Sequence, residues 1–198
     1  NKSHKTSVAY LVGKNYISVG RSRPTLSFAV NGQTYSAVKF FTWDLGSQQT
    51  LSAVSPQVFG STRYLYQSWS DNGDSSHQAT INTNTTTYTV NYKVQYKIIG
   101  TLNPGGIPST IVGGNLFYDS ASTVSITVNP SQVQYNGKTW YFNRWNGTGP
   151  GSYTGTNLNA QVTMLGVIVQ HAIFDTIAPF GIQNLNTGDI WFFYGMGL

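Results

Sequence analysis

The sequence predicts an all-β protein built from packed sheets, and three observations lead to this fold class. Aromatic residues make up 14% of the 198 residues, and β-branched residues are abundant beside them. All six acidic residues are Asp, so the strong helix former Glu is absent. Apolar and polar residues alternate at period two between turn signals, and no stretch of ten residues has helical periodicity. These features favour strands throughout and exclude a helical bundle.

The first expected element is an apolar strand within residues 1–14. On a pleated strand, alternate side chains point to opposite faces, so both faces of this segment are apolar. An apolar strand at a chain end is prone to aggregation unless it pairs with another strand. Two interpretations stay open: an edge strand of its own sandwich, or a donor strand that inserts into a neighbouring subunit. The candidate donor residues are Thr6, Val8, Tyr10, Leu11 and Val12.

Two hairpins follow from the turn residues. Asn31-Gly32 lies between the β segments 25–30 and 34–35, and Asn136-Gly137 lies between 133–135 and 138–142. Asn-Gly favours a tight hairpin because both residues tolerate positive φ. Longer β segments are expected at residues 86–99, 122–128 and 167–174.

An internal repeat organises the chain, because residues 41–92 align with residues 116–174. Trp43-Asp44 matches Tyr118-Asp119 in this alignment, and Trp69 matches Trp145. Equivalent placement of the two Trp residues favours core packing over a sugar-binding platform. We therefore divide the chain into a donor strand (1–14), a first β-repeat unit (15–98), a second β-repeat unit (99–174) and a C-terminal segment (175–198).

The C-terminal segment contains a second apolar stretch, residues 189–194. Apolar side chains on both faces suit a central strand that is covered on both sides. We expect it to be a core strand of its own subunit that buries Trp191 and Phe193, or else part of the groove that receives a neighbour's strand.

The repeat carries a family resemblance. The segments Phe-Thr-Trp-Asp-Leu-Gly-Ser (41–47), Tyr-Leu-Tyr-Gln-Ser-Trp-Ser-Asp-Asn-Gly (64–73) and Thr-Thr-Tyr-Thr-Val-Asn-Tyr (86–92) resemble the secreted β-repeat module known as the bacterial repeat domain. Asn72 stands where that family has Gly, and Tyr92 stands where it has Phe. The resemblance implies extracellular β modules of surface proteins and exported enzymes, with no catalysis by itself. We expect an immunoglobulin-like β-sandwich arrangement of the two units.

The chain as a whole resembles the pilin of archaeal threads, which are surface filaments of glycosylated subunits joined by donor-strand complementation. The features shared with those pilins are extracellular β-repeats, the N-terminal strand, the absence of Cys and three Asn-x-Ser/Thr sequences. The resemblance implies identical subunits and N-linked glycans as partners. The acceptors would be Asn1, Asn84 and Asn146, and we expect the last two in loops.

Candidate chemical sites are few. Without Cys there is no thiolate nucleophile, disulfide or zinc–thiolate site. We interpret Asp71, Asp74 and His77 as a polar turn in preference to a Ca²⁺ site or a triad with Ser70. We therefore expect no catalytic residues, no cofactor and no metal. An isopeptide crosslink from Lys93 or Lys97 stays open.

The charge pattern restricts the partners. Eleven Lys and Arg residues give a net charge of +5, but they are dispersed, which argues against nucleic-acid binding. No apolar run reaches the length of a membrane-spanning helix. The function expected is a structural subunit of an extracellular, cell-surface filament, assembled head to tail and acting in adhesion or biofilm formation. The alternative is a carbohydrate-binding or spacer module of a cell-surface protein.

Overall fold

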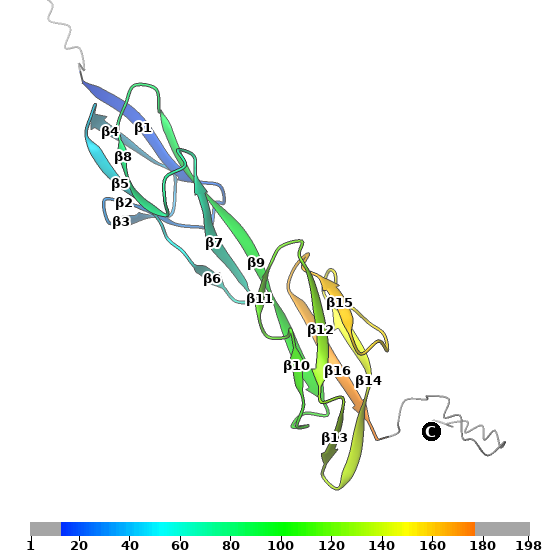
Figure 1. The fold of residues 1–198 in the computed structure, drawn as a ribbon. Helices are drawn as coiled ribbons and strands as arrows, with labels where there is room; N and C mark the ends of the chain where they lie inside the picture. Colours follow the sequence, from blue (N-terminus) through cyan, green and yellow to red (C-terminus); the bar gives the residue numbers. More distant parts are fainter. Residues whose placement is uncertain (1–12, 177–198) are drawn as a thin grey trace, which may run out of the picture.

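The structure, a computed structural model, describes residues 13–176 as an all-β protein, which confirms the predicted fold class. These residues form an elongated rod without helices (Figure 1). The strands are β1 (Lys14–Arg21), β2 (Phe28–Val30), β3 (Gln33–Tyr35), β4 (Lys39–Asp44), β5 (Gln48–Ala53), β6 (Gln57–Phe59), β7 (Thr62–Trp69), β8 (Ser76–Thr80), β9 (Thr87–Asn103), β10 (Thr110–Val112), β11 (Phe117–Asp119), β12 (Thr123–Asn129), β13 (Gln132–Tyr135), β14 (Lys138–Thr148), β15 (Ala160–Thr163) and β16 (Ile168–Asp175).

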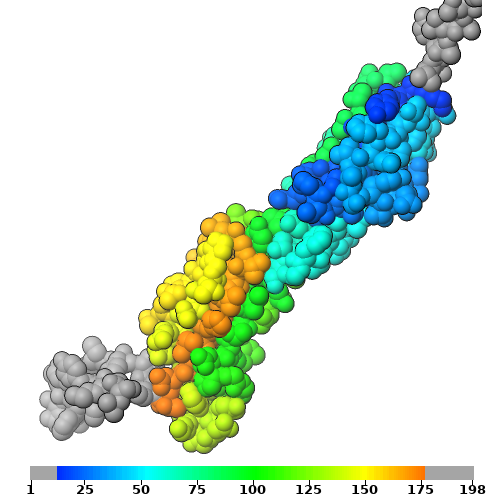
Figure 2. Space-filling view, turned by 180° about the vertical axis from the view of Figure 1, so that it is seen from behind, coloured from blue at the N-terminus to red at the C-terminus, as the bar shows by residue number. Residues whose placement is uncertain are grey.

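Two sandwich units lie end to end along the rod. A nine-stranded sheet, here called the shared sheet, runs through both units. In unit 1 it contributes β6, β7, the first half of β9, β1 and β4, and a four-stranded sheet ordered β3-β2-β5-β8 accompanies it. In unit 2 it contributes β13, β14, β16, the second half of β9 and β11, with a three-stranded sheet ordered β10-β12-β15. The space-filling view shows the same elongated outline from behind (Figure 2).

The two units are joined by one continuous strand, β9, which spans 17 residues. Its first half pairs in parallel with β1, with Thr87 opposite Ser18. Its second half pairs in parallel with β16, with Ile98 opposite Ile168. β9 is therefore the last strand of unit 1 and the first strand of unit 2. The predicted boundary between residues 98 and 99 falls inside this strand, and no linker separates the units.

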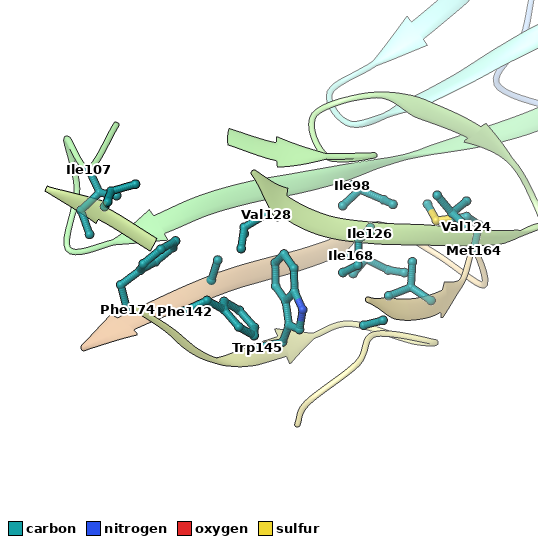
Figure 3. Close-up of a cluster of buried hydrophobic side chains, with 14 residues drawn as sticks. Ile98, Ile107, Val124, Ile126, Val128, Phe142, Trp145, Met164, Ile168 and Phe174 are labelled. Carbon is teal, nitrogen blue, oxygen red and sulfur yellow. The ribbon is translucent and has the colours of Figure 1, made fainter. Parts of the chain in front are cut away.

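Each unit has its own hydrophobic core around one buried Trp. Trp69 is 1% exposed and lies among apolar side chains of both sheets of unit 1. Trp145 is completely buried in unit 2, where it packs near Phe142 (Figure 3). Both indole N–H groups donate to a carbonyl in the loop that follows, to Ser75 and to Leu158. The prediction that both Trp residues belong to the core is confirmed.

The two units also share the position of a β-bulge, in β7 and in β14. The register between β7 and β9 shifts at Gln67, two residues before Trp69. The register between β14 and β16 shifts at Asn143, two residues before Trp145. A β-bulge bends its strand and re-aims the following side chains, so each bulge precedes the Trp that fills the core.

Both predicted hairpins form. Asn31 (φ 50°) and Gly32 (φ 81°) make the turn between β2 and β3, and Asn136 (φ 51°) and Gly137 (φ 72°) make the turn between β13 and β14. Positive φ at both central residues is the geometry that fits the twist of a two-residue hairpin.

Candidate functional sites

Several predicted functional residues lie outside the described part of the chain. They are the donor-strand residues Thr6, Val8, Tyr10, Leu11 and Val12, the glycan acceptor Asn1, and the apolar segment 189–194 with Trp191 and Phe193. The described chain begins with Gly13, whose φ of +99° makes a bend directly before β1. The carbonyl of Gly13 accepts a hydrogen bond from the amide of Leu45, at 2.6 Å, so this bend is fixed to the end of β4.

β4 offers the longest unpaired edge among the described strands. One side of its six residues pairs with β1, and the other side has no partner strand in the described chain. Hydrogen-bonded and non-bonded residue pairs alternate along an antiparallel ladder. Counted from the bond between Leu45 and Gly13, the main-chain groups of Phe40 and Thr42 point away from β1. Within residues 13–176 this edge therefore has main-chain donors and acceptors without a partner strand.

The outer face of β1 and β4 carries an exposed aromatic pair. Tyr16 is 62% exposed and Phe40 is 56% exposed, and their rings stack with centroids 5.4 Å apart and planes 6° apart. Val38 and Leu45, at the two ends of β4, are also exposed. We name these four residues the β4 patch. Sequence reasoning missed it, although the buried Ile17 implies that its neighbour Tyr16 faces outward.

The inner face of β4 carries half-buried aromatic rings. Phe41 stacks on Trp43 with centroids 4.5 Å apart, and the edge of Tyr35 in β3 meets Phe41 at 5.7 Å. These rings pack against the core of unit 1. The free edge of β4 is thus bordered by apolar side chains on both faces of the sheet.

The two described glycan acceptors are both exposed, but they differ in their backbone. Asn84 lies in the loop between β8 and β9, as predicted, in a turn held by the side chain of Asn82. The prediction that Asn146 lies in a loop is wrong, because Asn146 is part of β14 and lies opposite His171 of β16. The strand continues past Trp145 because β16 offers a continuous partner as far as Thr148.

The loop after β7 is held by His77. Its Nε2 lies 2.9 Å from Oδ2 of Asp71, and its Nδ1 lies 2.9 Å from the carbonyl oxygen of Asp74. Both ring nitrogens thus lie within hydrogen-bonding distance of an oxygen atom in this loop. The hydroxyl of Ser70 instead accepts a hydrogen bond from the amide of Thr89. The structure thus brings Asp71 and His77 together, and Ser70 does not join them.

A charged cluster lies on the surface where the two units meet. Asp119 of β11 accepts hydrogen bonds from Gln95 and Lys93, which are both on β9. The bond from Gln95 and the proximity of Lys93 lower the pKa of Asp119. The guanidinium of Arg63 in β7 lies 4.5 Å from the ring centroid of Phe117. Lys93 is half-exposed and paired with a carboxylate, and Lys97 is 6.0 Å from the same Phe117 ring.

A polar groove in unit 1 lies beside the bulge of β7. Within the groove the ring of Tyr92 extends into the sandwich, where its hydroxyl donates to the carbonyl of Ser27 at 2.7 Å. Burial raises the pKa of Tyr92 to about 12. The groove is lined by Ser22, Arg23, Gln67, Ser68, Asn91 and Tyr92.

Residues 13–176 lack two kinds of feature. These residues contain no group of three metal-ligating side chains, and none of their secondary structure is a helix that could cross a membrane. No family model matches the chain, and no solved structure matches its fold.

Proposed function

We propose that this chain is the structural subunit of an extracellular filament, assembled head to tail by donation of residues 6–12 to a neighbouring copy. The filament would act in adhesion or biofilm formation at the cell surface. N-linked glycans on the exposed Asn84 and Asn146 would face the surroundings. The observation that carries the proposal is the rod itself, whose described chain enters at one pole and leaves at the other (Figure 1).

The geometry supports assembly in three ways. β1 begins at one pole of the rod and β16 ends at the other, so the described chain enters and leaves the rod at opposite ends (Figures 1 and 2). Gly13 forms a turn with a φ of +99° directly before β1, and its carbonyl is bonded to Leu45, so the proposed donor segment is attached beside the end of β4. Residues 6–12 are uncharged and apolar on both faces, and such a strand is stable only where a partner supplies hydrogen bonds and apolar contacts.

The test compares charged substitutions inside and outside the proposed donor strand. Val8→Asp with Tyr10→Asp places two carboxylates on one face of the strand, and we expect it to abolish filaments seen by electron microscopy. Lys2→Asp with His4→Asp adds the same two carboxylates upstream of residues 6–12 and should leave filaments in place. Filaments of normal length from the first variant would overturn the proposal.

A spacer module of a cell-surface protein is the second candidate, and β9 favours it. A strand shared by two units sets a fixed spacing along one axis, which is the property of a stalk. A full-length chain that stays monomeric at high concentration in analytical ultracentrifugation would favour the spacer. Retention on a polysaccharide column would add the carbohydrate-binding role to it.

A further inference from the structure

Among the residues that the structure describes, the longest strand edge without a partner is that of β4, which carries the β4 patch. Surface apolar residues of soluble proteins are usually scattered, and a contiguous group with free main-chain groups marks an interaction site. The counterpart of β4 in unit 2 is β11, which has three residues and pairs with β9. The two units therefore differ at this edge, and only unit 1 presents a long one among the described strands.

We propose that the free edge of β4 receives residues 6–12 of a second copy of this chain, which add antiparallel to β4. The inference rests on the proposed function and names the acceptor within it. The seven residues match the six of β4 in length. A strand that is apolar on both faces fits this edge, because aromatic side chains border it on both faces of the sheet.

Charge selects the antiparallel direction. Lys5 directly precedes the donor residues. In antiparallel addition Lys5 lies next to Asp44 at the end of β4, where it would join the existing ion pair of Asp44 with Lys14; the side chain of Asp44 is 68% exposed. Parallel addition would place Lys5 beside Lys39 at the start of β4 instead. Opposite charges across neighbouring strands stabilise the pairing and like charges destabilise it.

The direction also decides what kind of assembly follows. β1 and β4 are antiparallel, so a strand added antiparallel to β4 runs parallel to β1 of the acceptor. The donor copy, which continues from this strand into its own β1, is displaced along the rod axis. A displaced copy cannot return the same contact to its acceptor, so the contact repeats from copy to copy and produces a filament.

The first experiment removes the two aromatic rings of the β4 patch from the full chain. Tyr16→Ser with Phe40→Ser replaces two rings that are more than half exposed, so the fold should be unaffected. We expect the concentration needed for filament formation to rise at least tenfold. Val58→Ser with Phe59→Ser is the matched control, because these residues of β6 are exposed to a similar extent, 55% and 51%. This control should assemble like the unmodified chain.

The second experiment tests contact and direction by disulfide crosslinking. The chain has no Cys, so introduced thiols react only with each other. Two single-Cys chains are mixed and oxidised, one carrying Lys39→Cys and the other carrying either Leu11→Cys or Thr6→Cys. Antiparallel addition predicts a crosslink with Leu11→Cys at least tenfold stronger than with Thr6→Cys. A stronger crosslink with Thr6→Cys would show parallel addition and overturn the inference.

The outcomes distinguish a failure of the β4 acceptor from a failure of the proposed function. If Val8→Asp with Tyr10→Asp abolishes filaments while removal of the two rings of the β4 patch does not, and no crosslink forms to Lys39→Cys, the donor strand stands and β4 is not its acceptor. If that donor variant assembles normally, both the donor role and the acceptor are overturned. If the Val8→Asp, Tyr10→Asp variant and the Tyr16→Ser, Phe40→Ser variant both lose filaments, and Leu11→Cys crosslinks to Lys39→Cys, the donor role and the β4 acceptor are both supported.

Discussion

Units 1 and 2 have the same strand order in the shared sheet but fill their interiors differently. Each buries one Trp behind a β-bulge and closes with a strand parallel to its first strand. Their buried amides differ. In unit 1 the amide of Gln57 bonds to the amide and carbonyl of Ser27 and to the carbonyl of Val54. In unit 2 the amide of Gln170 is completely buried, and neither its oxygen nor its nitrogen has a hydrogen-bond partner among residues 13–176.

The difference shows that the repeat preserves topology more strictly than polar chemistry. Bulge positions and strand pairing are set by main-chain geometry, which both units share. Side-chain networks depend on which residue faces which, and these have diverged: Tyr88 of β9 occupies the place that Gln170 has in β16. An unbonded buried amide destabilises a fold, whereas a fully bonded one is close to neutral or stabilising. The Gln170 side chain should therefore lower the stability of unit 2.

The largest expected effect comes from the two core Trp residues. Trp69→Ala or Trp145→Ala should lower the free energy of unfolding by about 3–5 kcal/mol, because each leaves a large cavity. The two cores are separate, so each substitution should unfold its own unit first and produce a biphasic urea transition. One cooperative transition in both variants would contradict two separable units. Trp140→Ala, at a half-buried position, is the control and should have a smaller effect.

Substitution of the two buried glutamines should change the free energy of unfolding in opposite directions. Gln57→Leu leaves main-chain groups of Ser27 and Val54 unbonded, and we expect it to lower the free energy of unfolding by about 2–3 kcal/mol. Gln170→Leu removes two unbonded buried atoms at similar volume and should raise this free energy by about 1–3 kcal/mol. Urea denaturation of both variants measures these two changes in the free energy of unfolding. A decrease of similar size in both would disprove the proposed difference between the units.

A smaller effect concerns Tyr92, whose counterpart in unit 2 is Phe174. Tyr92→Phe removes the hydrogen bond to Ser27 and should cost about 1 kcal/mol at neutral pH. Because burial raises the pKa of Tyr92 to about 12, the folded chain holds this proton more tightly than the unfolded chain. Stability is thus kept below pH 10 and lost as the pH rises from about 10 to about 12.

Thermal unfolding of the Tyr92→Phe variant between pH 8 and 12 tests this dependence. The variant should lose less stability over the alkaline range than the unmodified chain does. An unchanged alkaline profile would mean that another group causes the loss. Phe174→Tyr is not a suitable control, because it adds a hydroxyl to the core of unit 2.

The smallest expected effect is electrostatic. Asp119→Asn should lower the free energy of unfolding by less than about 1 kcal/mol, since its partners are exposed. The lowered pKa of Asp119 means that its contribution is present above the ordinary carboxyl range and is lost as the pH falls. The variant should therefore show a weaker acid dependence. Asp44→Asn, which breaks the equivalent ion pair with Lys14 in unit 1, is the control for a general loss of negative charge.

Local signals in the sequence predicted much of the fold. The hairpins at Asn31-Gly32 and Asn136-Gly137 follow from backbone preferences of two adjacent residues. The equivalence of Trp69 and Trp145 follows from the repeat. The continuity of β9 was not predicted, because residues 86–103 carry apolar side chains in both halves and alternation alone does not reveal a change of unit.

The candidate site was harder to predict. The β4 patch joins residues of β1 and β4 that are more than twenty positions apart, and their proximity depends on strand register. Gly147 and Gly149 predict a loop at Asn146, whereas pairing with β16 extends the strand. Such tertiary pairing overrides local turn signals.

Because β9 links both units, the rod has a simple mechanical consequence. A pull applied between Gly13 and Thr176 passes from β1 to β9 and from β9 to β16 through two parallel ladders. The tension runs along these strands, so the main-chain hydrogen bonds of each ladder are loaded in shear and must rupture together. The rod should resist stretching at low force and yield abruptly at high force.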